Sequence, residues 1–375
     1  EILKQFSMCM QSCINENQKI YELGNGRFII MDLANHSKED ILELYDELKK
    51  SVEVALEENV YRVVYTISVG IVEIDKEMKD YDTLIKYSDF ALNEAKKKGK
   101  NSCYFFTQDK YKQFIRRREI RVELQNAVDH NFKNFDVYYQ PIIDIHTRNL
   151  IGAEALMRFK MKRNEQIEFI SPAEFIPILE ESGLIIPAGR WILRQAVACC
   201  KKWQEFIPEF KVNVNLSYVQ IIKSKILDEI KHALKAFNLK PALLGIEVTE
   251  SGYLENTYHY KKLWSSLKEE GITLILDDYG TGYSNAYRLS DLTPHYIKID
   301  RVLTQKALSS NYERSILIYI IEMAHSLKLN VCIEGVETEE ELQEIKKLNP
   351  DYIQGYLFGK PAPEDEFYNR QIKKK

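Results

Sequence analysis

A regular alternation of short apolar runs and amphipathic segments, from about residue 132 onward, restricts the fold of this chain most strongly. Runs rich in β-branched residues end in polar residues at 212–217, 245–251, 273–279, 296–300, 331–337 and 352–358. Segments with helical periodicity lie between most of them, at 225–237, 258–270, 312–327 and 339–348. So many strand–helix units predict an α/β fold, a closed (β/α)8 TIM-type barrel, with a doubly wound open sheet as the alternative.

The first 106 residues have a different, α+β pattern. It predicts helices at 2–13, 38–57 and 81–98, and strands at 63–74 and 103–106. Two further strands meet at Asn25-Gly26, because Asn-Gly between apolar runs is typical of a hairpin. A polar, helical stretch follows at 107–128, which is typical of a solvated connecting helix. We therefore predict a smaller domain at 1–106, a connecting helix at 107–131 and the barrel at 132–375.

Charge and composition exclude several classes of protein. The formal net charge of −4 excludes the strongly basic surface that binds nucleic-acid polymers. No apolar run approaches the roughly 20 residues that cross a bilayer. The six scattered cysteines lack a Cys-x-x-Cys pair and are typical of reduced, mostly buried thiols rather than a zinc site. We expect a cytoplasmic protein; because the chain opens at Glu1, an upstream segment absent from it could also tether it.

Polar residues gather where the barrel strands are expected to end. They are Glu154, Asn215, Glu247, Asp277, Asp278, Lys298, Glu334 and Gln354. The carboxyl ends of the strands converge on one face of a (β/α)8 barrel, and that face holds the active site. Carboxylates crowded together in this way need positive charge among them. The sequence therefore predicts a site that holds cations at this face.

A cluster of carboxylates and amides without histidine or cysteine favours a hard cation, Mg²⁺ or Mn²⁺. Because the chain turns at a strand end, both Asp277 and Asp278 can reach such a pocket, where one can bridge two ions. Two ions about 3.5–4 Å apart suit phosphodiester displacement, in which the attacking and leaving oxygens both carry negative charge. Lys298 would add a fixed positive charge that orients the attacking water.

Strand alternation adds candidate substrate contacts. Glu154, Leu156 and Arg158 are two residues apart, so they share one face of their strand. That arrangement puts a metal carboxylate beside a guanidinium, which recognises phosphate well. Lys298 and Asp300 share a face in the same way.

At these residues the chain resembles the EAL family of cyclic-di-GMP phosphodiesterases. Residues 154–158 match the family signature E-x-L-x-R. Further matches lie in order at 140–142, 171–172, 175–177, 215–217, 247–251, 277–284, 298–300, 334–338 and 354–356. Three letters alone would be worthless, whereas this ordered set across the second half of the chain is very specific. Tyr279 stands where the family usually has phenylalanine, which should be a mild change.

The resemblance implies a barrel whose first strand runs antiparallel to the rest, and hydrolysis of cyclic di-GMP to linear pGpG. It implies that Glu154, Asn215, Glu247 and Asp277 hold one metal ion, and that Asp277, Asp278 and Glu334 hold the other. Lys298 would position or help to deprotonate the water, with Gln354 nearby. The expected substrate-binding residues are Gln140, Leu156, Arg158, Pro177, Asp300 and Glu337. Glu250 would brace the loop after Asp278, a loop that contributes to dimerisation in the family, so a homodimer is expected.

The first domain resembles GGDEF diguanylate cyclases, but it lacks their acidic signature. Residues 21–28 occupy the place of Y-R-L-G-G-D-E-F, with Gly26 and Arg27 where the family has two acids. The family's opening strand and its R-x-x-D inhibitory motif are also absent, whereas 68–70 and the helix at 89–98 match. We therefore expect no cyclase activity, and either GTP binding without chemistry or a packing and dimerisation module.

Two other functions remain as alternatives. The first is a non-catalytic cyclic-di-GMP receptor, although receptors in this family tend to have lost metal or lysine positions that this chain keeps. The second is an unrelated barrel metalloenzyme that acts on a small phosphate or sugar, since barrels host many chemistries. Turnover of cyclic di-GMP in Mg²⁺ or Mn²⁺ separates all three readings.

Overall fold

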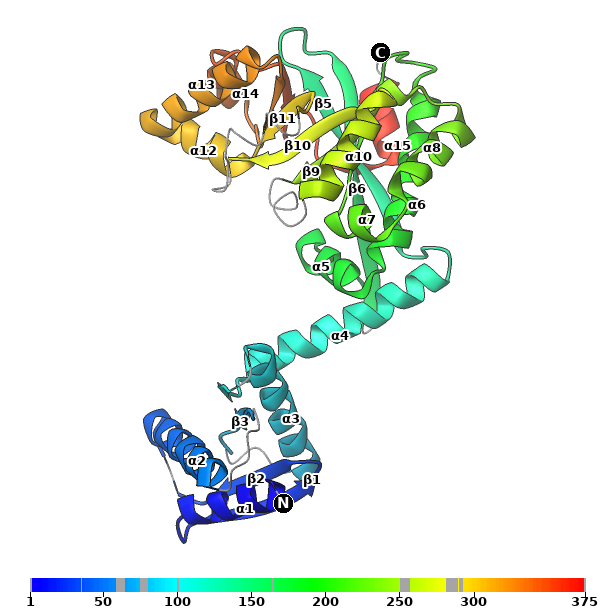
Figure 1. Cartoon of the computed structure of the whole chain (residues 1–375). Helices are drawn as coiled ribbons and strands as arrows, with labels where there is room; N and C mark the ends of the chain where they lie inside the picture. Colours follow the sequence, from blue (N-terminus) through cyan, green and yellow to red (C-terminus); the bar gives the residue numbers. More distant parts are fainter. Residues whose placement is uncertain are drawn as a thin grey trace. The chain divides into compact units, whose positions relative to one another are not determined.

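The structure is a computed structural model that describes residues 2–34, 36–58, 65–74, 80–99, 101–163, 165–249, 257–280, 289 and 293–373. Its Cα atoms divide into two compact units, residues 1–116 and 117–375 (Figure 1). The division falls inside α4 (Gln108–Asp129), a helix that lies within the expected connecting stretch at 107–131. The assignment of residues 107–131 as a linker separate from both domains remains a prediction.

In its described residues, the first unit combines two small sheets with three helices and the beginning of α4. In chain order its elements are α1 (Ile2–Cys13), β1 (Gln18–Gly24), β2 (Arg27–Asp32), α2 (Lys38–Glu58), β3 (Val69–Ile71), α3 (Tyr81–Lys97) and β4 (Cys103–Phe105). The hairpin at Asn25-Gly26 is confirmed, with φ of 54° and 70°, the positive values that a tight Asn-Gly turn needs. The strand expected at 63–74 is shorter, because β3 pairs with only three residues of β4; residues 63 and 64 lie outside the described part.

In the second unit, eight of the described strands close into a barrel, as expected from the strand–helix alternation. They are β5 (Phe135–Asp144), β6 (Leu150–Arg163), β8 (Lys211–Asn215), β9 (Leu244–Thr249), β10 (Thr273–Tyr279), β11 (Tyr296–Ile299), β12 (Asn330–Glu334) and β13 (Tyr352–Gln354). β5 is antiparallel to both of its barrel neighbours, β6 and β13, whereas the other neighbours pair in parallel. The antiparallel first strand is therefore confirmed. β7 (Gln166–Ile170) and β14 (Ala362–Pro363) extend the sheet beside β6 and β5.

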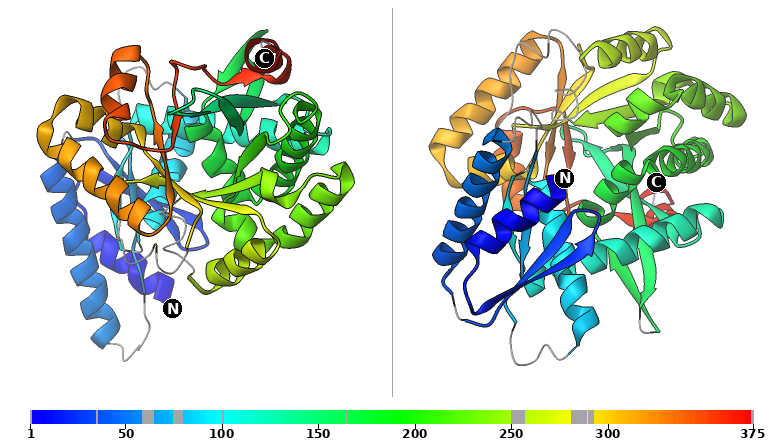
Figure 2. Two further views of the ribbon diagram at one scale, coloured as in Figure 1. Left: turned by 90° about the horizontal axis from the view of Figure 1, so that it is seen from above. Right: turned by 60° about the horizontal axis from the view of Figure 1, so that its bottom comes forward.

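Helices cover the outside of the barrel (Figures 1 and 2). They include α5 (Pro172–Ser182), α6 (Ile185–Trp203), α7 (Tyr218–Lys223), α8 (Ile226–Phe237), α10 (Thr257–Glu269), α12 (Arg301–Ser309), α13 (Asn311–Ser326), α14 (Glu339–Lys346) and α15 (Glu364–Phe367). The four helices expected between strands are confirmed as α8, α10, α13 and α14 to within one or two residues. The strand expected at 352–358 ends at Gln354, because the parallel register with β12 stops there.

Burial on both faces explains the apolar runs of these strands. In β10, Leu274, Ile275 and Leu276 are all buried, because helices cover one face of the sheet and the barrel interior covers the other. None of the described helices has the length and apolar character that a bilayer span needs. The six cysteines are free thiols, and Cys9, Cys199, Cys200 and Cys332 are buried, as expected.

The barrel interior is built in layers, because residues two apart on a strand face the same side. The upper layer consists of Glu154, Glu247, Asp277, Lys298, Glu334 and Gln354. These residues lie near the carboxyl ends of their strands, except Glu154, after which β6 continues to Arg163, contrary to the expectation that Glu154 lies near a strand end. Two positions earlier on the same strands lie Gly152, Gly245, Ile275, Tyr296, Cys332 and Tyr352. The upper layer is polar and the lower one is mostly apolar, with Ile275, Tyr296 and Cys332 in one buried cluster. The strand register thus brings the chemistry to one level of the barrel.

Candidate active site

Lys298 lies at the centre of the upper layer, surrounded by four carboxylates. Its Nζ atom is 2.9 Å from Glu154 Oε2, 3.0 Å from Glu247 Oε2 and 2.7 Å from Glu334 Oε1. Asp277 Oδ1 lies 3.5 Å from the same nitrogen. The lysine side chain is 1% exposed, so water screens these interactions very little. Five residues from five strands, predicted to form one site, thus lie together.

Amide side chains complete the cluster around Glu154. Asn215 Nδ2 donates to Glu154 Oε1 at 2.7 Å, and Gln354 Nε2 donates to Glu154 Oε2 at 2.7 Å. Gln354 Nε2 also donates to Gln140 Oε1 at 3.1 Å, which brings in the antiparallel strand β5. The strand register explains this, since Gln140 pairs directly with Glu154 across β5 and β6. Gln354 Oε1 is buried and has no hydrogen-bond partner among the described residues.

Asn213 also belongs to the site, although it was not among the site residues predicted from the sequence. It is 2% exposed, and its Nδ2 donates to Glu247 Oε1 at 2.8 Å and also to the hydroxyl of Tyr296. Gly245 on the next strand makes room for it, because a Cβ there would lie 2.2 Å from Asn213 Oδ1. The alternation Val212-Asn213-Val214-Asn215 puts Asn213 on the same face as Asn215, and that was the available signal.

The electrostatics of the cluster reflect four acids that share one ammonium group. Burial raises the pKa of Glu247 well above its ordinary value, and it raises the pKa of Asp277 and brings that of Glu334 to about 8. Burial alone would also raise the pKa of Glu154, but the Lys298 charge outweighs it and the net pKa is lowered. Burial alone would lower the pKa of Lys298, yet the four carboxylates hold it well above its usual value. The four carboxylates therefore carry more negative charge than Lys298 alone can neutralise.

The backbone at Asp278 explains how two neighbouring acids reach the same region. Asp278 has a φ of 57°, a left-handed conformation that aspartate tolerates better than most residues. The register between β10 and β11 shifts between Leu276 and Tyr279, so the chain bends at the two aspartates. Burial raises the pKa of Asp278 to about 6, and the charge of Asp277 adds to the effect.

The expected substrate contacts lie on several elements. Leu156 and Arg158 follow Glu154 on β6, and the Arg158 guanidinium lies 5.5 Å from the ring centre of Tyr138. Pro177 is inside α5. Arg158 Nη1 donates to its neighbour's carbonyl, Met157 O, at 2.9 Å, which leaves other guanidinium hydrogens for a ligand. The roles of these residues remain predictions.

The remaining candidates make local contacts near α12. Asp300 caps α12 and accepts a hydrogen bond from Val302 N at 2.7 Å. Glu337 pairs with Arg301 at 2.6 Å. Glu250 lies outside the described residues, as do residues 281–284 of the matched motif.

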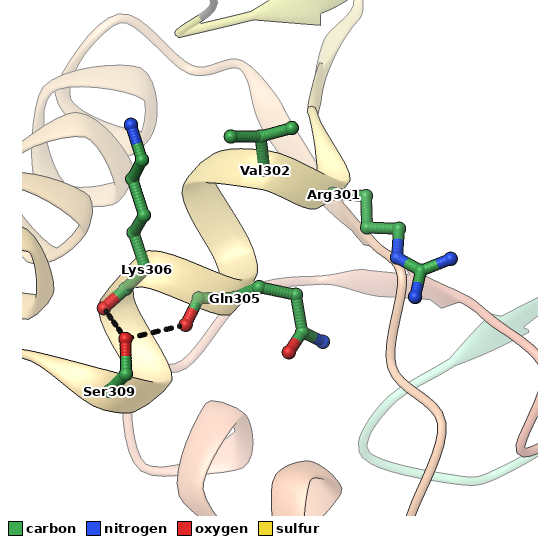
Figure 3. A pocket seen from close by; sticks show the side chains of 5 residues that line it. All are labelled: Arg301, Val302, Gln305, Lys306 and Ser309. Carbon is green, nitrogen blue, oxygen red and sulfur yellow. Dashed lines mark hydrogen bonds between the residues drawn. The ribbon is translucent and has the colours of Figure 1, made fainter.

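Helix α12 also supports the loop after Glu334. Gln305 Nε2 donates to Gly335 O at 2.9 Å, and the Arg301–Glu337 pair holds the same loop two residues later. Figure 3 shows Arg301 and Gln305 on α12, lining a surface pocket of about 350 Å³. The Ser309 hydroxyl donates to the carbonyls of Gln305 and Lys306 at the end of the helix. The position of Glu334 thus depends on α12 as well as on β12.

The donor set fits a hard divalent cation. Ligand atoms of Glu154, Glu247 and Asp277 all lie within 4.8 Å of one another, and every one is a carboxylate oxygen. Oxygen donors of this kind suit Mg²⁺ or Mn²⁺. The buried Gln354 Oε1, which has no hydrogen-bond partner among the described residues, is a further oxygen atom beside these carboxylates. The number and identity of the ions remain predictions.

In the first unit, the structure describes the contacts of Gly26 and Arg27, which stand where the acidic signature has its two acids. Gly26 has a φ of 70° in the hairpin turn. Arg27 forms an ion pair with Asp89 of α3 at 2.6 Å, so its charge is directed at an acid. These contacts tie the hairpin to α3.

Comparison with known proteins gives matches over both units. Residues 121–361 match the EAL domain family, and residues 1–102 match the family described as diguanylate cyclase, GGDEF domain. The signaling protein YkoW of Bacillus subtilis (strain 168) is 31% identical over 372 residues, which are 98% of this chain and 45% of YkoW. The cyclic di-GMP phosphodiesterase PdeR of Escherichia coli (strain K12) is 28% identical over 378 residues, 100% of this chain and 56% of PdeR. This chain thus spans about half the length of these curated relatives.

A solved structure supports the same relationship. The PaMucR phosphodiesterase in complex with c-di-GMP is 29% identical, with a TM-score of 0.62. The match covers 66% of this chain and 99% of the PaMucR chain.

Proposed function

Since this chain belongs to the EAL family, with a GGDEF domain before its EAL domain, we propose that it hydrolyses cyclic di-GMP to linear pGpG. The observation that carries the proposal is the cluster of Glu154, Glu247, Asp277 and Glu334 around Lys298 at one end of the barrel. A receptor that only binds the ligand has no need of four buried acids that share one ammonium group. Burying such charges without a compensating ligand is costly.

The metal-holding residues in this proposal are those named from the sequence. They are Glu154, Asn215, Glu247, Asp277, Asp278 and Glu334, with Asp277 shared by two Mg²⁺ or Mn²⁺ ions. Such ions supply an activated water and neutralise charge on the reacting phosphate. Asn215 and Gln354 fix the two oxygens of Glu154, and Asn213 fixes Glu247, so the carboxylates are oriented in advance.

Lys298 and Arg158 provide positive charge from the protein itself. Lys298 Nζ donates hydrogen bonds to Glu154 and Glu247, which supports a role in positioning the water. Arg158 offers planar guanidinium hydrogens to a phosphate oxygen on the same face as Glu154. Gln140, Leu156, Pro177, Asp300 and Glu337 would make the remaining substrate contacts.

We further propose that the GGDEF domain is not a cyclase and that the protein is a homodimer through its EAL domain. Support for the first part comes from Gly26 and Arg27, which replace two acids, and from the Arg27–Asp89 pair. An arginine at this position repels the cation that such an acid would hold. The GGDEF domain would then regulate or support the phosphodiesterase. Incubation of the Glu154→Gln variant with GTP and Mg²⁺ should yield neither cyclic di-GMP nor pGpG.

The test is an assay of the purified chain with cyclic di-GMP and Mg²⁺ or Mn²⁺, followed by chromatography of the nucleotides. We expect pGpG with metal and none after chelation. Glu154→Gln keeps the side-chain shape but removes the charge, and it should lower turnover at least 100-fold. The control is Glu209→Gln, on an exposed residue, which should retain turnover. Unchanged substrate, together with binding that survives chelation, would contradict hydrolysis and support a receptor.

A further inference from the structure

A second pocket opens at the opposite end of the barrel, by the amino ends of the parallel strands. Its volume is about 440 Å³, within the range of roughly 300–1,000 Å³ that is usual for small-molecule sites. The lining comes from β5, from the starts of β6, β8, β10, β11, β12 and β13, and from the turns that precede some of these strands. Two of its lining residues, Asn213 and Tyr296, adjoin the carboxylate cluster through the Asn213–Glu247 hydrogen bond, whereas its lysines lie at or before the amino ends of the strands.

The ionisable side chains that line this pocket carry either positive charge or none. Lys211, Lys268, Lys328 and His295 line it, and none of the described residues lining it is acidic. Lys211 and Lys328 make no ion pair with a described residue, and Lys268 Nζ donates to the hydroxyl of Thr293 at 3.1 Å. A bound anion would relieve their mutual repulsion.

Two of these lysines, Lys268 and Lys211, lie near the ring of His295. Burial lowers the pKa of His295, and the charges of Lys268 and Lys211 lower it further, so both lysines lie close to the ring. His295 Nδ1 accepts the amide hydrogen of Leu274 at 2.9 Å, so the neutral ring carries its own hydrogen on Nε2. Because Nδ1 accepts from the backbone, Nε2 is the ring nitrogen of His295 that can donate a hydrogen bond to another group.

Two tyrosines add further donors from the barrel interior. The Tyr296 hydroxyl oxygen accepts from Asn213 Nδ2, and the Tyr352 hydroxyl oxygen accepts from Asn330 Nδ2 at 3.1 Å. Each phenol therefore retains its hydrogen for an acceptor that the described residues do not supply. Burial raises the pKa of Tyr296 well above its ordinary value, which keeps that hydrogen in place. Tyr296 is 8% exposed, so part of this lining belongs to the interior and not to the surface.

We propose that this pocket binds a small oligophosphate, through the three lysines at its rim and the donors of His295 and Tyr296. A lining with hydrogen-bond donors and three positive charges is complementary to an anion with several oxygens. A triphosphate group has that charge and number of acceptors. Free tripolyphosphate and a nucleoside triphosphate share this chemistry, and the experiment separates them.

The test is isothermal titration calorimetry of the whole chain with tripolyphosphate, in a buffer that contains a chelator. Chelation leaves the carboxylate cluster without a cation, so anions are repelled from the active site. We expect one site per chain. Lys211→Gln, Lys268→Gln and Lys328→Gln in one protein should weaken binding at least 10-fold. A matched triple variant, Lys201→Gln, Lys223→Gln and Lys235→Gln, removes the same charge from exposed helix positions and should change binding less than 2-fold.

A second variant tests the interior donors. Tyr296→Phe keeps the ring and the lysines but removes the hydroxyl, and it should weaken tripolyphosphate several-fold. Circular dichroism melting checks that each variant is folded. Absence of binding to the unaltered chain, or equal weakening by both triple variants, overturns the proposal. A parallel titration with ATP distinguishes the source: tighter binding than tripolyphosphate identifies a nucleotide, and equal binding identifies the phosphate chain alone.

Discussion

Asn213 shows how much a single buried side chain does in this protein. One amide group holds Glu247 on one side and the phenol of Tyr296 on the other, so it connects the upper and lower layers of the barrel. Glu247 is 0% exposed and has two hydrogen-bonded oxygens, one to Asn213 and one to Lys298. Loss of either donor leaves a buried carboxylate oxygen unsatisfied. We regard Asn213 as a positioning residue for Glu247.

We predict that Asn213→Ala costs about 1–3 kcal/mol of unfolding free energy, the usual cost of a buried group left without its partner. The variant should also need more Mg²⁺ or Mn²⁺ for half-maximal turnover, because Glu247 loses its orientation. Urea unfolding followed by tryptophan fluorescence measures the first effect, and metal titration of the assay measures the second.

Asn126→Ala is the control for this prediction, since Asn126 is exposed on α4. Its stability should change by less than about 0.5 kcal/mol. Unaltered stability and unaltered metal dependence in Asn213→Ala would refute the positioning role.

At the scale of elements, the site depends on loops that helices brace from outside the barrel. Glu334 ends β12, and the chain then leaves the sheet through Gly335, which has a φ of 78°. Gln305 and Arg301 of α12 hold this loop by a hydrogen bond to Gly335 and an ion pair with Glu337. The packing is close, because a Cβ on Gly335 would lie 2.3 Å from Arg301 Cγ. A change on α12 can therefore alter the site without touching it.

We predict that Gln305→Ala lowers turnover several-fold, because Glu334 loses part of its support. The melting temperature should fall by only a few degrees, since Gln305 is outside the hydrophobic core. Lys306→Ala is the matched control, on the next residue of the same helix, where the side chain is exposed. Equal turnover in the two variants would show that the α12 contact is unimportant for Glu334.

At the scale of the whole molecule, the two units have separate cores. The first unit buries a small cluster that contains Cys9, Met10, Leu48, Val52 and Ile67. The second buries one large cluster that extends from Ile120 to Ile372. Small cores provide less stabilisation for each ordered residue. The first unit should therefore be the less stable of the two.

We predict two unfolding transitions in urea. The three tryptophans, Trp191, Trp203 and Trp264, all lie in the second unit, so their fluorescence reports that unit alone. Circular dichroism should show an earlier transition that leaves tryptophan fluorescence unchanged. Residues 117–375 alone should keep the midpoint of the fluorescence transition. Coincident transitions by both probes, or loss of the fluorescence transition in the fragment, would argue against separate stability.

The sequence by itself determined the fold class and the kinds of residue at the candidate site. Strand–helix alternation predicts strands buried on both faces, as in a (β/α)8 barrel or a doubly wound open sheet, and barrel closure was seen only in the structure. Polar residues at strand ends, such as Glu154 and Lys298, must then lie at one face, whichever strands are neighbours. The hairpin at Asn25-Gly26 was equally local, because few residues tolerate positive φ. Patterns within about ten residues carried all of this information.

Only the tertiary structure decided which of these groups touch. The four carboxylates around Lys298 lie between 21 and 144 positions from it in the chain, since Asp277 and Glu154 are the extremes. The role of Asn213 depends on Gly245 of the next strand, and the support of Glu334 depends on a helix. The cationic pocket joins residues from seven of the described strands. Such contacts follow from strand register and barrel closure, which bring together residues that share no local pattern.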